Sequence, residues 1–130
     1  MKAIVQTVAG AFAVDLETDE VEPAELEHED VQVVETGLPR VIAAVASGST
    51  VVALVDARPP LLVSHDAGRT WRDAGGGLPA GRAVAIADDD PDLVLYAARN
   101  RLFLSRDGGR FWSALALELP EIERIAFREV

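Results

Sequence analysis

Two stretches of the chain carry the same short pattern, and they lie 41 residues apart. Residues 64–71 are SHDAGRTW and residues 105–112 are SRDGGRFW, so both follow S-x-D-x-G-x-[T/F]-W. The Asp is placed to fold its carboxylate back onto turn amides, and the Gly supplies a backbone conformation that other residues resist. The pattern therefore predicts two tight turns with a structural role for Ser64, Asp66, Gly68, Thr70, Trp71, Ser105, Asp107, Gly109, Phe111 and Trp112.

Short apolar runs around these turns predict a repeated unit of four strands. Residues 41–46 and 83–87 are rich in Ala and Val with almost no polar alternation, as expected for strands buried on both faces. A third run, 122–127, follows Glu118-Leu119-Pro120 much as the first two follow Gly-Leu-Pro. The other expected strands are 3–8, 11–16, 50–55, 61–63, 71–73, 93–98, 102–104 and 112–115.

The paired turns resemble the Asp-box, or BNR repeat, which closes the hairpin between the third and fourth strands of β-propeller blades. Sialidases, sortilin-like sorting receptors and photosystem assembly factors carry such repeats. The resemblance implies an all-β chain of four-stranded antiparallel blades in one domain. Blade 1 is 1–39 plus 122–130, blade 2 is 40–80 and blade 3 is 81–121. Setting Val14 against Leu104 makes 15–22 a degenerate Asp-box, and the C-terminal strand supplies the innermost strand of blade 1.

Three blades are too few for a closed propeller, because propellers carry about four to eight. A lone half would expose two apolar flanks, which monomeric proteins avoid. Two copies give six blades, and two-fold homodimers are the commonest oligomers. We therefore expect a six-bladed propeller formed by a homodimer. A fragment, or a half that pairs with a different polypeptide, is the alternative, and the final strand can complete a blade in its own chain or in the partner's.

The resemblance also implies where a ligand binds. In propellers the loops between blades and those between second and third strands share one face, opposite the Asp-boxes. That face collects five arginines, and guanidinium groups bind carboxylates, phosphates and sulfates through paired hydrogen bonds. Alternatively, these side chains solvate loops and pair with nearby carboxylates. The candidate ligand-binding residues are Arg40, Arg58, Arg82, Arg99 and Arg101.

No catalytic residue is assigned. Sialidases use a tyrosine nucleophile, but Tyr96 is the only tyrosine here and occupies a packing position of the repeat. No Ser-His-Asp set, phosphate loop or metal motif occurs, so neither cofactor nor metal is expected. We expect a non-catalytic binding or assembly module, with itself as partner and a protein or a small anion as ligand. A minimal glycan-binding or glycosidase propeller for an anionic sugar is the alternative.

The composition and the N-terminal sequence limit which classes of partner and which cellular compartment we expect. The net charge of −10 argues against nucleic acids and anionic membranes, and the absence of cysteine excludes disulfides. The acidic stretch 22–30 is interpreted as a solvated edge that blocks strand pairing, with docking of a basic partner or a cation as the alternative. The N-terminus resembles a short signal peptide ending at Ala11-Phe12-Ala13, but Gln6 and Thr7 interrupt its apolar run. A cytoplasmic location is expected, with secretion as the alternative.

Overall fold

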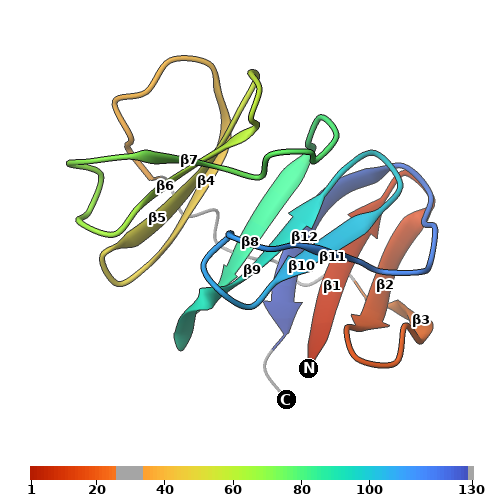
Figure 1. Cartoon of the computed structure of the whole chain (residues 1–130). Coiled ribbons are helices and arrows are strands. Elements are labelled where there is room, and N and C mark those ends of the chain that lie inside the picture. Colours follow the sequence, from red (N-terminus) through yellow and green to blue (C-terminus); the bar gives the residue numbers. More distant parts are fainter. Residues whose placement is uncertain (26–33, 129–130) are drawn as a thin grey trace.

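Three four-stranded antiparallel sheets make up the computed structural model, which describes residues 1–25 and 34–128 (Figure 1). The first sheet has the order β12 (Ile122–Arg128), β1 (Lys2–Thr7), β2 (Gly10–Asp15), β3 (Val21–Ala24). The second has the order β4 (Val41–Ser47), β5 (Thr50–Val55), β6 (Leu61–Ser64), β7 (Arg72–Ala74). The third has the order β8 (Ala83–Ala87), β9 (Asp90–Ala97), β10 (Leu102–Ser105), β11 (Ser113–Ala114). This confirms the all-β class and the units of four antiparallel strands.

The C-terminal strand β12 completes the first sheet by pairing with β1 of its own chain, one of the two arrangements that the sequence left open. The register runs from Lys2 opposite Arg128 to Thr7 opposite Ile122, with an irregularity after Gln6. Ile122 is fully buried, and its amide donates to the Arg99 carbonyl at 2.8 Å. One sheet therefore contains strands from both ends of the chain.

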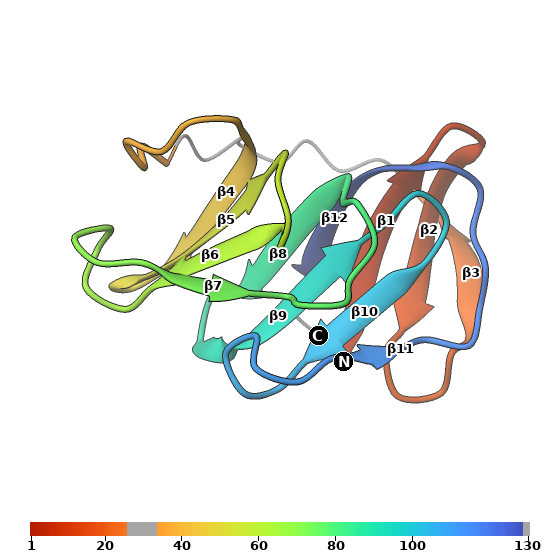
Figure 2. The same ribbon diagram turned by 45° about the horizontal axis from the view of Figure 1, so that its top comes forward.

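The third sheet lies between the other two, as both views show (Figures 1 and 2). Its strand β8 touches β4 on one side and β12 on the other. Side chains alternate along a strand, so the two faces of the third sheet enter two separate cores. Leu95, Leu102 and Leu104 pack with residues of the first sheet, whereas Val94 and Tyr96 pack with residues of the second.

The innermost strands β8 and β4 differ in burial. All five residues of β8 are buried, as predicted for a strand covered on both faces. In β4 only Ser47 is buried, and the Ile42 side chain is 52% exposed. The prediction of burial on both faces is therefore wrong for β4 in the single chain, because the second sheet has a neighbour on one side only.

Two sheet faces point away from the third sheet and belong to neither core. The strand registers place alternate residues on them. The first-sheet flank consists of Lys2, Ile4, Gln6, Ala11, Ala13, Asp15, Glu22, Ala24, Arg124, Ala126 and Arg128. The second-sheet flank consists of Ala44, Ala46, Val51, Ala53, Val55 and Leu62.

The degenerate Asp-box at 15–22 needs a correction. Val14 and Leu104 belong to the same core and face each other from neighbouring sheets, so they are not equivalent positions of a repeat. The connection from β2 to β3 is also shorter than the one from β6 to β7. A carboxylate still organises it, since Asp15 Oδ1 accepts the amides of Glu17 at 2.9 Å and Thr18 at 3.2 Å.

One expected strand begins earlier than the sequence indicates, and the acidic stretch is described only in part. Strand β9 begins at Asp90, so the strand expected at 93–98 starts earlier, inside the acidic turn. Of the acidic stretch 22–30, residues 26–30 lie outside the described residues, and Glu22 and Pro23 belong to the outer strand β3. Within residues 1–25 and 34–128, no helix has the length and apolar character needed to cross a membrane.

Candidate functional site

The turn at 64–71 is closed by hydrogen bonds that involve the side chains of Ser64 and Asp66. The Ser64 hydroxyl donates to Asp66 Oδ1 at 2.7 Å and accepts the Gly68 amide at 2.8 Å. The Asp66 carboxylate accepts the Thr70 hydroxyl at 2.6 Å and the Thr70 amide at 2.8 Å. These bonds from Thr70, with that from Ser64, hold the pKa of Asp66 well below its ordinary value. Gly68 has a φ of 88°, the left-handed conformation for which the pattern needs glycine.

The turn at 105–112 repeats this arrangement. The Ser105 hydroxyl donates to Asp107 at 2.8 Å and accepts the Gly109 amide at 2.9 Å. Asp107 accepts the Phe111 amide at 3.0 Å, and this bond lowers the pKa of its carboxyl group. Phe111 lacks the hydroxyl of Thr70, and its side chain is 78% exposed. In both turns the carboxylate is occupied by the turn itself, which fits a structural role.

The second turn also joins two sheets. Arg72 of β7 donates from Nη2 to the Gly108 carbonyl at 2.8 Å, and the Gly108 amide donates to the Asp92 carbonyl at 2.9 Å. The Arg72 Nε atom is buried and has no hydrogen-bond partner among the described residues. An arginine thus spans the junction between the second and third sheets, a contact that the repeated pattern alone does not predict.

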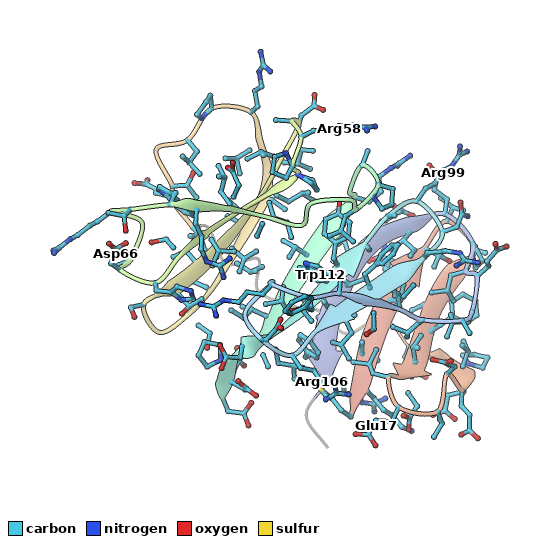
Figure 3. The ribbon with its side chains drawn as sticks, viewed as in Figure 1. Glu17, Arg58, Asp66, Arg99, Arg106 and Trp112 are labelled. Carbon is cyan, nitrogen blue, oxygen red and sulfur yellow. The ribbon has the colours of Figure 1, made fainter. Side chains whose placement is uncertain are left out.

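The five candidate arginines lie at the strand ends opposite the two turns. Arg40 and Arg82 precede β4 and β8, whereas Arg58, Arg99 and Arg101 lie in the loops that follow β5 and β9. Because β4 pairs with β5 and β8 with β9 in antiparallel fashion, these positions share one rim of each sheet. Figure 3 shows Arg58 and Arg99 on one side of the molecule and Arg106 and Glu17 on the other.

Three of these arginines pair with carboxylates of the β11–β12 connection. Arg82 Nη2 lies 2.9 Å and Arg99 Nε 3.8 Å from Glu121 Oε1, so one carboxylate brings these two arginines together. Arg101 Nη2 lies 3.5 Å from Glu118 Oε1. Ion pairs of this exposed kind contribute little to stability. The guanidinium groups can therefore leave these carboxylates to bind another anion.

Arg40 and Arg58 stand apart from these pairs. Neither forms an ion pair with the described residues. Arg40 has a φ of 61°, an uncommon conformation for a residue other than glycine. The arginines therefore form a discontinuous rim rather than one cluster.

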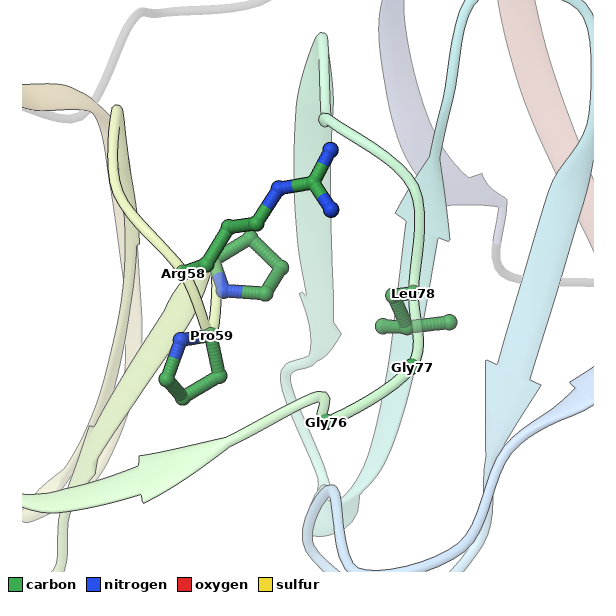
Figure 4. A pocket seen from close by; sticks show the side chains of 6 residues that line it. Arg58, Pro59, Gly76, Gly77 and Leu78 are labelled. Carbon is green, nitrogen blue, oxygen red and sulfur yellow. The ribbon is translucent and has the colours of Figure 1, made fainter.

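A shallow hollow of about 380 Å³ lies beside Arg58 (Figure 4). It is lined by Arg58, Pro59, Pro60, Gly76, Gly77 and Leu78, from the β5–β6 and β7–β8 connections. This hollow was not predicted from the sequence. The residues that could have indicated it are Gly76 and Gly77, which have no side chains to fill the space beside Pro59 and Pro60. Arg58 is its only charged residue.

Tyr96 takes the packing role that its position in the repeat predicts. Its side chain is fully buried, with Phe103 and Trp112 edge-on at ring-centroid distances of 6.2 and 5.9 Å. Its hydroxyl donates to the Pro79 carbonyl, and burial raises its pKa to about 12. A buried and hydrogen-bonded phenol with a raised pKa is unsuited to act as a nucleophile.

Comparison of this chain with family models, curated proteins and solved structures finds no match. Within residues 1–25 and 34–128, no group of three His, Asp or Glu side chains is placed to hold a metal ion.

Proposed function

We propose that this chain is a non-catalytic binding or assembly module, a half-propeller of the Asp-box kind that closes into a six-bladed ring with a second copy. The contrast between β8 and β4 supports this proposal. The same kind of strand is fully buried where it has neighbouring sheets on both sides and half-exposed where one is absent. A second copy would supply the absent neighbour at both ends of the three-sheet array.

The arginine rim is the proposed binding surface. In a two-copy ring the five arginines would recur around the central axis, so a protein or small anionic ligand would meet ten guanidinium groups. Arg99 retains 70% side-chain exposure despite its contact with Glu121. Arg58 is exposed beside the hollow. These two are the residues on which ligand binding should depend most.

The assembly is tested by light scattering coupled to size-exclusion chromatography. The expected mass is twice the 13.9 kDa of one chain. A single species with the mass of one chain would rule out the ring.

Ligand binding is tested separately, by calorimetric titration with sulfated and carboxylated oligosaccharides. We expect Arg58→Ala and Arg99→Ala to weaken binding of whichever probe binds, whereas Arg106→Ala, on the opposite side (Figure 3), should not. Equal weakening by all three substitutions would indicate a general charge effect and contradict a site on the rim. Turnover of fluorogenic glycosides that disappears in Arg99→Ala or Arg101→Ala would contradict a non-catalytic role.

A further inference from the structure

The two sheet junctions within the chain show how neighbouring sheets pack. The second sheet offers Val52, Leu54 and Val63 to one face of the third sheet. The opposite face of the third sheet packs on the first. In the order second, third, first sheet, we call the face towards the next sheet the leading face and the opposite face the trailing face. Each junction therefore joins a leading face to a trailing face. The two faces left over are the trailing face of the second sheet and the leading face of the first, the same combination as at the two junctions within the chain.

The centres of the two flanks match in size and order. On the first-sheet flank, a cross-strand row runs from Ala126 through Ile4 to Ala13. On the second-sheet flank, the corresponding row runs from Ala44 through Ala53 to Leu62. Both rows are given from the innermost strand outwards. Laid strand on strand, they set Ile4 over Ala53 and Leu62 over Ala13. Ala53 and Ala13 are already buried in the single chain, at 0% and 2% exposure, so the contact would cover chiefly the half-buried Ile4 and Leu62 side chains.

The charges on the flanks oppose pairing of like with like. The first-sheet flank carries the cations Lys2, Arg124 and Arg128 and the anions Asp15 and Glu22, and Glu22 pairs with Lys2 at 3.2 Å. Arg124 and Arg128 form no ion pair with the described residues, so two such flanks face to face would bring these two cations of each copy together, which is costly. The strand residues on the outward face of the second sheet include Asp73, opposite Leu62, and no cation, because Arg72 of β7 lies opposite Val63 on the other face. An arginine at such a junction has a precedent in this molecule, because Arg72 donates across the junction between the second and third sheets.

We infer that the first-sheet flank of one copy packs on the second-sheet flank of another, with β12 against β4. This inference rests on the proposed two-copy ring and specifies its contact. The contact is head-to-tail, joins two different surfaces, and occurs twice in a ring of two copies. A contact of one flank with the same flank of the partner would instead leave the other flank bare on each copy.

Cross-linking between single cysteines tests this contact, because the chain has no cysteine of its own. One variant carries Ala44→Cys on β4 and the other carries Ala126→Cys on β12; both positions are half-buried in the single chain. The two purified variants are unfolded, mixed, refolded and treated with a short bismaleimide. The control replaces the Ala126→Cys variant with Ala116→Cys, at an exposed position of the β11–β12 connection.

The expected result is a two-chain product from the mixture of Ala44→Cys and Ala126→Cys, and none from either variant alone or from the control mixture. A product from either variant alone would show that a flank meets itself and would overturn the inference. So would a dimer by light scattering that gives no cross-link in the mixture. A single-chain mass by light scattering would instead refute the two-copy ring itself, so the two failures are distinguishable.

Discussion

The Tyr96 hydroxyl donates to the Pro79 carbonyl and lies directly over Gly81, which ties the C-terminal end of β9 to the connection between the second and third sheets. A Cβ atom at Gly81 would lie in severe overlap with that hydroxyl and 2.7 Å from Leu54 Cδ1. Gly81 is therefore needed for the close approach of its backbone to two buried side chains.

Replacing Gly81 by alanine should destabilise the fold by about 1–3 kcal/mol, the usual cost of overpacking a filled core. The midpoint of urea unfolding, followed by tryptophan fluorescence, measures this change. Gly76→Ala is the matched control, since a Cβ there meets nothing within 4 Å. Equal midpoints for the two variants would show that the Tyr96 contact tolerates the methyl group.

The raised pKa of Tyr96 should make stability fall at alkaline pH. The folded pKa of about 12 exceeds the ordinary value of 10.0 because burial disfavours the phenolate. The neutral phenol is therefore favoured by folding. Its contribution is fully present below pH 10 and is lost between about pH 10 and 12, at up to roughly 1.4 kcal/mol per pH unit.

Tyr96→Phe isolates this effect, because the chain has no other tyrosine. The variant should lose about 1 kcal/mol near neutral pH, where it lacks the bond to Pro79. Its urea midpoint should then depend less on pH above 10 than that of the parent chain. Parallel curves for the two proteins would mean that the phenol does not titrate with unfolding.

The sequence predicted the strands well because their signals are local. Ala, Val and Leu runs bounded by glycine, proline and acidic turns place β5 and β8 at the positions observed. The pattern S-x-D-x-G-x-[T/F]-W likewise contains the Ser and Asp side chains that close the two turns and the Thr70 and Phe111 amides that they bind. The pairing of β12 with β1 followed from counting strands, since the first sheet otherwise lacked one.

What the sequence could not supply depends on contacts between segments far apart in the chain. The exposure of Ile42 on β4 reflects the absence of a neighbouring sheet, which no local pattern records. The partners of Arg82, Arg99 and Arg101 depend on where the β11–β12 connection runs. The error at Val14 arose because a weak repeat fixes neither the number of residues in a turn nor the face to which each residue points.

Asp66 should make the fold sensitive to acid. Its folded pKa is depressed, so its stabilising contribution is present above the ordinary value of 3.8 and is lost as the pH falls below it. In Asp66→Asn the amide cannot accept both bonds from Thr70 and the one from Ser64 equally well. The melting temperature should therefore be lower than in the parent at pH 7, and the difference should shrink towards pH 3.

Asp89→Asn serves as the control, because this exposed residue between β8 and β9 accepts no side-chain hydrogen bond within the described part of the chain. Its melting temperature at pH 7 should match that of the parent. A drop as large as that of Asp66→Asn would trace the effect to the loss of negative charge rather than to the turn.

Removing residues 122–130 should prevent folding of the first sheet. The truncation takes away the β12 partner of every residue of β1, which keeps only its pairing with β2. It also removes the fully buried Ile122 and leaves one side of the core around Val5 uncovered. Loss of dispersed amide signals in a two-dimensional NMR spectrum would report this. A truncation after Arg128 keeps the whole of β12 and should retain the parent spectrum. If the shorter chain also kept that spectrum, β12 would be dispensable, and so would the junction proposed between β12 and the partner's β4.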